Sequence, residues 1–514
     1  MPGISIKNFA NASGGVFYNG GVPYDANGAL LVGGQGVFSQ RPITCVIVGD
    51  SILGGGTATT TLAGLTSSGT TCTGTWTGSP VNLGGTIFIS GANESAYNGF
   101  FTVTSTSGNN FTYTALSTPS ATTATGTINA TLQHRNNERN WVATANALMG
   151  WPIDKIYNAA VSGTTSAQCL STFSRDVPGL TPDIVVIQTG TNDVYTDVAI
   201  ATTQSNLRAI VAAVFAQGAR PLLCTIPPRS DATATAARIA VANNLNAWIR
   251  YYAQTTPGVA FFDTFTYLVN PTSSTNAYIT NYGASDNIHP SGLAGQVLGT
   301  PMQAVLADIL PNAVLANRYV HAITDSVAIT AGNRQWVTNP LMQGTGGTLA
   351  GGATGAFVPD NWTVTKTGAG ATLAVTQDNP RSDGYGSNVI MTMTSTANND
   401  AAALTSTSFH SNITAGDLVN YEVEVAISSI TALSSLEISV DYTVGGTAYF
   451  WRANSTSGSN VHWGNNGTYI FRPCVPLTWP AGSTTNAQIR VQGTFTGAGG
   501  AVIKVARAAV RKLN

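Results

Sequence analysis

Four short runs of the chain contain the residue types that serine-dependent ester hydrolysis needs. They are Gly49-Asp50-Ser51 and residues 162–165, 190–193 and 286–290. A serine nucleophile requires a base that takes its proton, a group that orients this base, and donors that stabilise the oxyanion. The four runs together contain a hydroxyl, an imidazole, a carboxylate, a side-chain amide and glycine N–H groups. They therefore predict acyl transfer.

Each group can be given a position in such a site. Ser51 follows an apolar run at a tight turn, where its hydroxyl is expected to be exposed. Asp286 stands three residues before His289, close enough to accept a hydrogen bond from its Nδ1–H. The backbone N–H groups of Ser51 and Gly163 and the side-chain amide of Asn192 could point at one oxygen. Convergence of these groups depends on the fold.

The elements around the four runs predict a parallel sheet. Continuous apolar runs alternate with helical patterns over residues 41–320. The predicted strands are 44–48, 155–158, 183–188, 220–226 and 259–263, and the predicted helices are 137–149, 203–217, 232–254 and 291–310. Buried strands that alternate with helices indicate a parallel sheet covered on both faces, which binds ligands at the carboxyl ends of its strands. The first three catalytic runs follow predicted strands.

The four runs, in this order, resemble the conserved blocks of the SGNH (GDSL-type) hydrolases. The matching residues are Gly49-Asp50-Ser51, Gly163, Gly190-x-Asn192-Asp193 and Asp286-x-x-His289-Pro290, within residues 41–56 and 134–310. The resemblance implies a flavodoxin-like three-layer α/β fold and ester hydrolysis without a metal or another cofactor. It implies that Ser51 is the nucleophile, His289 the base and Asp286 its orienting group. It further implies an oxyanion hole formed by Ser51, Gly163 and Asn192.

Other roles for these residues stay open at this point. Ser51 could cap a helix, and His289 could be an ordinary loop residue. Asp50 and Asp193 are interpreted as turn-stabilising residues. Arg229, which follows the fourth predicted strand, could bind an anionic substrate or could be an exposed arginine without a role, and Tyr195 is a second candidate for substrate binding.

A segment of different composition interrupts the α/β pattern at residues 57–133. Between Ser51 and Gln133 the only charged residue is Glu94. Stretches such as 86–90, 101–104 and 111–114 alternate with period two and end at Gly or Asn turns, which predicts a small all-β module. A disordered linker is the alternative. Six aromatic side chains could build a core for the module: Phe88, Tyr97, Phe100, Phe101, Phe111 and Tyr113.

The two ends of the chain complete the predicted domain organisation. Residues 1–40 are rich in Gly and Asn and predict an arm or a small β element. Residues 331–514 show alternating runs separated by turns, which predicts an antiparallel β-sandwich. This region loosely resembles jelly-roll carbohydrate-binding modules in its Asn-Pro-Leu-Met start and its Asp360-Asn361-Trp362 turn. Its five tryptophans could stack on sugars, although we expect at least three to pack in the core: Trp336, Trp362, Trp451, Trp463 and Trp479.

The amino-acid composition limits the kinds of molecule that the protein is expected to bind. Charged residues make up 9% of the 514 residues, against about 25% in an average soluble protein, and the net charge is −1. We therefore expect no nucleic-acid partner. The chain has no run of about 20 apolar residues and no apolar leader at its start, so we expect neither a membrane partner nor a secretory signal. The five scattered cysteines predict neither a disulfide framework nor a metal site, and Cys45 and Cys224 are expected to be buried.

The combined pattern leads to a functional hypothesis. The start of the chain and residues 97–104 resemble segments of bacteriophage structural proteins and fibres. We hypothesise a carbohydrate O-esterase of a phage tail, which removes acyl groups from an acylated bacterial polysaccharide and is assembled with other virion proteins in the host cytoplasm. An extracellular location and a homotrimer are also considered. The alternative functions are a catalytically silent virion protein for adhesion and a general lipase or esterase.

Overall fold

The computed structural model describes residues 10–12, 16–19, 22–24, 43–54, 59–77, 81–133, 139–177, 179–310, 336–382, 386–454, 464 and 466–513. The chain divides into two compact units. The α/β unit comprises Met1–Gly55, Pro152–Pro290 and Leu298–Arg318, and the β unit comprises Gly56–Trp151, Ser291–Val297 and Tyr319–Asn514. His134, Trp463 and the predicted boundary between residues 320 and 331 lie outside the described residues.

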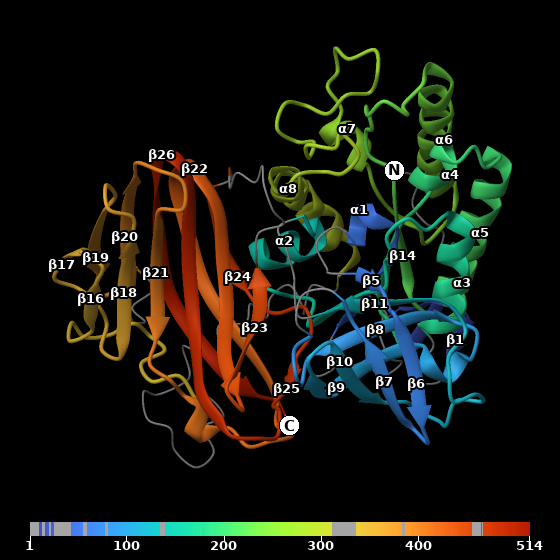
Figure 1. The fold of residues 1–514 in the computed structure, drawn as a ribbon. Helices are drawn as coiled ribbons and strands as arrows, with labels where there is room; N and C mark the ends of the chain where they lie inside the picture. Colours follow the sequence, from blue (N-terminus) through green and yellow to red (C-terminus); the bar gives the residue numbers. More distant parts are fainter. Residues whose placement is uncertain are drawn as a thin grey trace. The chain divides into compact units, whose positions relative to one another are not determined.

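A five-stranded parallel sheet forms the centre of the α/β unit (Figure 1). Its strands, in spatial order, are β12 (Lys155–Asn158), β4 (Thr44–Gly49), β13 (Ile184–Gln188), β14 (Arg220–Cys224) and β15 (Ala260–Phe262). All four neighbouring pairs are parallel. The residues of β13 are buried throughout, which explains the continuous apolar runs seen in the sequence.

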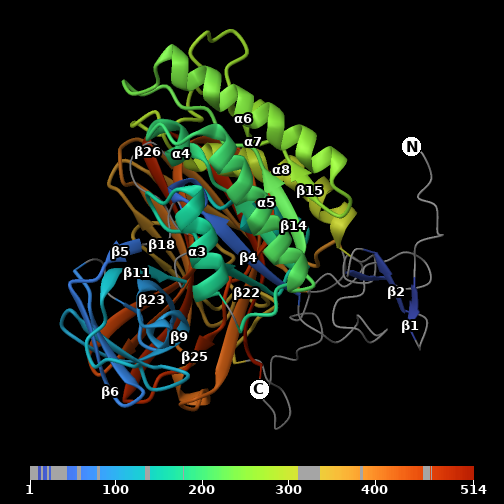
Figure 2. The same ribbon diagram turned by 90° about the vertical axis from the view of Figure 1, so that its right-hand side faces the viewer.

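The helices of this unit connect the parallel strands. They are α1 (Ser51–Gly54), α3 (Ser166–Asp176), α4 (Thr191–Tyr195), α5 (Ile200–Ala216), α6 (Ala236–Thr255) and α7 (Thr264–Leu268), and α8 (Gly292–Ile309) continues from one unit into the other. Helix α3 contacts β4 and α5 contacts β14, as Figure 2 shows. Helices α1, α3, α4 and α7 were not predicted. Helix α3 is a short amphipathic segment rich in polar residues, and the other three have five residues or fewer.

The strand order of the parallel sheet indicates where a ligand is expected to bind. In chain order the five strands are arranged 2-1-3-4-5, so the direction of winding reverses between β4 and β13. In open parallel sheets ligands bind outside the carboxyl ends of the strands at this reversal. Ser51 follows β4 and Asn192 lies on α4 directly after β13. Two of the predicted site residues are therefore at the topological position where a ligand is expected.

The inserted segment folds as an all-β module within the β unit. Its seven strands are, in spatial order, β5 (Thr59–Thr61), β11 (Gly126–Leu132), β8 (Thr86–Ala92), β9 (Gly99–Ser107), β10 (Asn110–Thr114), β7 (Thr71–Thr75) and β6 (Gly64–Ser68), and the short 3₁₀ helix η2 (Ser95–Tyr97) precedes β9. A buried cluster fills the module and contains, among others, Leu65, Trp76, Ile87, Tyr97, Phe101, Phe111 and Tyr113. Full burial of each such side chain stabilises the fold by about 1.5–3 kcal/mol. Four of the six predicted aromatic core residues belong to this cluster, whereas Phe88 and Phe100 lie outside it and stack on each other with ring centres 4.4 Å apart. The linker alternative is wrong.

The C-terminal part of the β unit is a mixed sheet of eleven strands. Its strands are β16 (Thr348–Ala350), β17 (Thr354–Gly355), β18 (Trp362–Thr367), β19 (Thr372–Asp378), β20 (Asn388–Ser395), β21 (Ala401–Ser406), β22 (Leu418–Val444), β23 (Thr447–Asn454), β24 (Gly467–Phe471), β25 (Leu477–Thr478) and β26 (Thr484–Lys512), with the 3₁₀ helix η3 (His410–Asn412) before β22. Two pairs, β16 with β18 and β17 with β19, are parallel. The purely antiparallel prediction is wrong for these short edge strands, whose few residues carry too little pattern to reveal direction.

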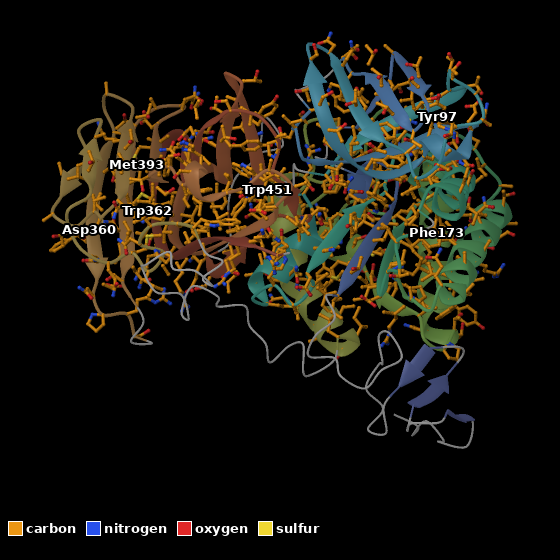
Figure 3. All side chains as sticks on the ribbon, turned by 90° about the horizontal axis from the view of Figure 1, so that it is seen from below. Tyr97, Phe173, Asp360, Trp362, Met393 and Trp451 are labelled. Carbon is orange, nitrogen blue, oxygen red and sulfur yellow. The ribbon has the colours of Figure 1, made fainter. Side chains whose placement is uncertain are left out.

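The tryptophans of this region pack in its interior. Trp336, Trp362, Trp451 and Trp479 are all buried, and Figure 3 shows Trp362 and Trp451 among the strands. The expectation that at least three would be core residues is confirmed. The two short motifs quoted above contact each other, because the indole N–H of Trp362 donates to the carbonyl oxygen of Asn339 at 3.1 Å. They serve here to close a turn.

The inserted module and the C-terminal strands contact each other within the β unit. The Asn82 side-chain amide donates to the Phe450 carbonyl oxygen at 2.6 Å, and the Tyr442 hydroxyl donates to the Leu83 carbonyl oxygen at 2.8 Å. The backbone N–H of Thr478 donates to the Gly84 carbonyl oxygen at 3.1 Å. The module is therefore built onto the C-terminal sheet although it is inserted in the sequence of the α/β unit.

The unit boundary near residue 134 differs from the predicted one. Helix α2 (Trp141–Leu148) contacts β24, and both belong to the β unit, so the α/β unit resumes at Pro152. Of the first 40 residues, three short strands are described, β1 (Ala10–Ala12), β2 (Val16–Asn19) and β3 (Val22–Tyr24), which pair into one small sheet. Among the helices of the described ranges, none combines the length and apolar character needed to cross a bilayer.

Candidate active site

The structure brings Ser51, His289 and Asp286 into one hydrogen-bonded row. The Ser51 Oγ lies 2.8 Å from the His289 Nε2, and the His289 Nδ1 lies 2.6 Å from the Asp286 Oδ2. Ser51 and His289 are 238 residues apart in the sequence. With the proton on Nδ1 facing the carboxylate, Nε2 is free to accept the serine proton. The geometry has the form that a serine nucleophile and its base require.

The loop that carries His289 is held by its own hydrogen bonds. The second oxygen of Asp286 accepts from the backbone N–H groups of Ile288 and His289 at 2.9 and 3.0 Å. The Tyr278 hydroxyl donates to the Ile288 carbonyl oxygen at 2.9 Å. Partial burial raises the pKa of Asp286, but the hydrogen bonds from the His289 ring and from the two backbone N–H groups outweigh it and leave this pKa below its usual value. Asp286 is thus kept as a carboxylate.

Asp50, directly before Ser51, is completely buried. Its Oδ1 accepts from the Ile52 backbone N–H at 3.0 Å, which confirms the predicted turn-stabilising contact. Burial raises the pKa of Asp50 to about 7, against the opposing hydrogen bond from Ile52 and with a further upward contribution from the nearby Asp193 carboxylate. Among the residues that the structure describes, none forms a hydrogen bond with its Oδ2. This burial could not be predicted from the residues around Asp50.

The predicted oxyanion donors lie on two turns that are joined to each other. Gly163 has φ of +78°, a left-handed conformation in which glycine carries no steric cost. The Asn192 side-chain amide donates one hydrogen to the Thr164 carbonyl oxygen at 2.9 Å, which leaves its second N–H for another acceptor. The Val161 N–H donates to the Gly49 carbonyl oxygen at 3.1 Å, so the Gly163 turn is also tied to the strand before Ser51.

Asp193 makes contacts that differ from the predicted ones. Its carboxylate accepts hydrogen bonds from Ser166 and Thr203, on α3 and α5, whereas backbone bonds within its own turn were expected. Ser166, Thr203 and Asn206 were missed. One signal was present in the sequence, because Thr165-x-x-Gln168 is a capping-box pattern that marks the start of α3.

Arg229 and Tyr195 contact each other beside the catalytic loop. The guanidinium carbon of Arg229 lies 3.8 Å from the centre of the Tyr195 ring, a cation–π arrangement. Arg229 also pairs with Asp231 at 2.7 Å, and its hydrogen bonds lower the pKa of Asp231 to about 2. The next N–H, that of Ser230, donates to the Asn287 carbonyl oxygen at 3.0 Å. The guanidinium thus already has partners of its own.

Over the described part of the chain, no group of three or more His, Cys, Asp or Glu side chains is arranged to hold a metal ion. The five cysteines are buried and unbridged, including Cys45 and Cys224, whose burial was predicted.

Comparison with known proteins assigns this region to a family. Residues 120–296 match the GDSL-like Lipase/Acylhydrolase family. The match covers about a third of the chain. It contains Gly163, Asn192, Asp286 and His289, and it begins inside the inserted module, so the match leaves out Ser51. Ser51, which directly follows Asp50 at the end of β4, lies 2.8 Å from His289 of the matched segment. The protein is a serine ester hydrolase.

Three solved structures illustrate what the chain is similar to. A putative acylhydrolase from Bacteroides fragilis is 27% identical, over 30% of this chain and 76% of that one, with a TM-score of 0.27. An acetylxylan esterase from Geobacillus stearothermophilus is 15% identical, over 53% and 98%, with a TM-score of 0.32. The tailspike protein 4 enzymatically active domain of bacteriophage CBA120 is 16% identical, over 30% and 20%, with a TM-score of 0.22. No curated protein matches the chain. With scores of this size, the assignment depends on the family match.

Proposed function

We propose that the protein is a carbohydrate O-esterase that removes acyl groups from a polysaccharide, with Ser51, His289 and Asp286 as its catalytic residues. The observation that carries the proposal is the Ser51–His289–Asp286 row, with distances of 2.8 and 2.6 Å. A row of this kind turns a weak hydroxyl into a nucleophile, because the imidazole removes the proton as the new bond forms.

The reaction follows from the positions of the atoms. The Ser51 Oγ attacks the ester carbonyl carbon, and its proton moves to the His289 Nε2. Asp286 stabilises the resulting imidazolium, while the N–H groups of Ser51 and Gly163 and the Asn192 amide stabilise the oxyanion. The sugar hydroxyl leaves with the proton from His289. Water, activated by the same imidazole, then cleaves the acyl-serine and releases the acid.

The surroundings of the site support a polar substrate over a lipid. In the described chain, the large hydrophobic side chains that are exposed are Leu116, Tyr251, Tyr267, Phe357 and Leu513. None of them lies on the loops that carry Ser51, Gly163, Asn192 or His289. A lipase acting on an aggregated substrate needs apolar surface at its site, whereas the nearby side chains here include Arg229, Asp231 and Asn287.

Acetate release tests the proposal. Wild type, Ser51→Ala and Ser205→Ala are compared on an O-acetylated xylan and on an emulsified long-chain triacylglycerol. Ser205 is an exposed serine of α5 in the same unit and serves as the matched control. We expect Ser51→Ala to lower kcat by about 10⁴-fold or more and Ser205→Ala to leave it unchanged.

Three results would count against the proposal. Equal acetate release by wild type and Ser51→Ala would exclude Ser51 as the nucleophile. Faster release of fatty acid than of acetate by wild type would favour the general lipase. Absence of Ser51 labelling by a fluorophosphonate would favour a catalytically silent adhesion protein.

The biological setting is proposed from the sequence resemblances alone. We propose that the esterase is a tail component of a virion, possessing partners among other virion proteins and forming a homotrimer. Light scattering of the purified chain tests the oligomeric state, and a monomer at micromolar concentration would contradict the homotrimer.

For Arg229 and Tyr195, substitution by alanine should raise KM for an anionic polysaccharide more than for a neutral one if they bind substrate.

A further inference from the structure

A buried carboxylate that the proposed reaction does not use lies next to the oxyanion donors. Asp193 is 1% exposed. Its Oδ2 accepts from the backbone N–H of Ser166 at 2.7 Å, and its Oδ1 accepts from the Ser166 hydroxyl at 2.5 Å and from the Thr203 hydroxyl at 3.1 Å. Three donors from two other helices therefore converge on one side chain of α4.

Ser166 is fixed from a second direction. The Asn206 side-chain amide, on α5, donates to the Ser166 Oγ at 2.9 Å. Because this oxygen accepts from Asn206, its own proton is directed to Asp193. The first turn of α3, the helix α4 and the first part of α5 thus meet in one closed, buried hydrogen-bond cluster.

The cluster lies between the two turns that provide the proposed oxyanion donors. Ser166 stands three residues after Gly163, and Asp193 directly follows Asn192. The two bonds between Asp193 and Ser166 therefore join the Gly163 turn to the Asn192 turn. The bond from Asn192 to the Thr164 carbonyl oxygen, at 2.9 Å, is a parallel but weaker connection, because both of its partners are uncharged.

We propose that Asp193 is a positioning residue, whose carboxylate sets the spacing between the Gly163 N–H and the Asn192 amide and so shapes the oxyanion hole. The proposal rests on the proposed function, because it assigns a cause to the geometry of that site. Oxyanion donors act only when they are aimed at the place where charge develops, and a misplacement of about 1 Å can lower the rate 100-fold.

The carboxylate is required because it accepts without donating. An alanine at position 193 leaves the buried Ser166 N–H without an acceptor. An asparagine can accept from that N–H, but its NH₂ group then faces the hydroxyls of Ser166 and Thr203, which must turn to accept. Asp193→Asn is therefore expected to retain part of the function that Asp193→Ala loses.

A merely structural role of Asp193, as a cap of α3, must be separated from this one. Asp183 provides the matched control, because it is also a buried aspartate of the α/β unit, 3% exposed, and its Oδ2 accepts from the Thr44 backbone N–H at 2.7 Å. It lies at the amino end of β4 and β13, opposite the end that carries Ser51 and Asn192. A loss of stability alone would affect the Asp183 and Asp193 variants alike.

The experiment compares Asp193→Ala, Asp193→Asn, Ser166→Ala and Asp183→Asn with wild type, by kcat and KM for acetate release and by the rate of Ser51 labelling with a fluorophosphonate. We expect kcat to fall about 10- to 1,000-fold in Asp193→Ala and less in Asp193→Asn and Ser166→Ala, with KM changed less than threefold. Labelling should slow in parallel. Asp183→Asn should lower the melting temperature and leave kcat of the folded protein unchanged.

The outcomes separate the two proposals. The positioning role is wrong, while the proposed function stands, if wild type releases acetate and Asp193→Ala has the same kcat as Asp183→Asn. If Asp193→Ala does not fold, Ser166→Ala takes its place in this comparison. If kcat falls equally in all variants, Asp193 acts only through stability. If wild type itself shows neither acetate release nor Ser51 labelling, the proposed function fails.

Discussion

The two carboxylates beside the candidate site and two partly buried carboxylates of the C-terminal sheet are stabilised differently. Beneath the candidate site of the α/β unit, Asp50 and Asp193 accept hydrogen bonds only from N–H and hydroxyl donors. In the β unit, Glu424 is paired with Arg381 and with Arg507. Glu437 is likewise paired with Arg452 and Arg490.

The difference separates groups that shape a site from groups that hold a sheet. Pairing a partly buried acid with two arginines compensates its charge, so that the contact stabilises the sheet. An acid that lies next to a serine hydroxyl and has no cationic partner keeps a charge or a proton that acts on the site. Its burial without a cation lowers the stability of the fold. Substitution of the carboxylates beside the site should therefore affect kcat or the pH dependence of stability, whereas substitution of those in the C-terminal sheet should affect the free energy of unfolding.

The largest expected effect comes from Asp286→Asn in the α/β unit. The neutral amide does not stabilise an imidazolium as a carboxylate does, and its NH₂ group can donate to the His289 Nδ1 and favour the wrong tautomer, so kcat should fall by roughly 10²–10⁴-fold. Steady-state kinetics of acetate release by the variant and by wild type measure the effect. A variant within threefold of wild type would contradict the role of Asp286.

Asp50→Asn should change how stability depends on pH. The folded pKa of Asp50, about 7, lies above its ordinary value of 3.8, so the folded state holds the proton more tightly. The stabilisation that Asp50 contributes through this difference in pKa is complete below about pH 4 and is lost as the pH rises to about 7. Above that pH, Asp50 no longer changes the free energy of unfolding. The total change is on the order of 4 kcal/mol.

Urea unfolding between pH 4 and 8 tests this prediction. Asparagine has no carboxyl proton to lose, so the free energy of unfolding of Asp50→Asn should gain on that of wild type as pH rises, and the gain should stop near pH 7–8. A difference that stays constant with pH would show that Asp50 titrates normally.

Glu424→Gln should affect the stability of the β unit. The change leaves two partly buried arginines, Arg381 and Arg507, without a carboxylate, which lowers the free energy of unfolding by about 3 kcal/mol. Because Glu424 lies outside the site, kcat of the folded protein should stay unchanged. A fall in kcat without loss of stability would break the contrast between the two units.

The smallest expected effect concerns the contact between the module and the C-terminal strands. Gly84 has φ of +80°, and a Cβ there would lie 2.0 Å from the Thr478 carbonyl oxygen. Gly69, with φ of +60° and open space around it, is the matched control. Gly69→Ala should lower the free energy of unfolding by about 1 kcal/mol and Gly84→Ala by about 2 kcal/mol or more. Equal losses would mean that the contact contributes little.

The positions of the three catalytic residues could be predicted from the sequence, whereas the buried contacts beside them could not. Ser51, His289 and Asp286 could be placed because strand ends of a parallel sheet meet at one edge, and their types define a known chemistry. The strands of the module could be predicted from alternation. Asp50 and Asp193 were underestimated, because an aspartate at a turn has the same sequence signature whether its carboxylate is exposed or buried. The contact of Tyr442 with Leu83 had no local signal, because 359 residues separate them.

The insertion has a consequence for the order in which the chain can fold during synthesis. Strand β4 and Ser51 leave the ribosome before the module, but the partners of β4 in the sheet, β12 and β13, follow more than 100 residues later. The module pairs mostly with itself over short loops, so its contact order is lower and it should form first. The nascent chain must therefore keep an apolar strand unpaired while the module folds, and a chaperone that shields this strand would raise the yield of active enzyme.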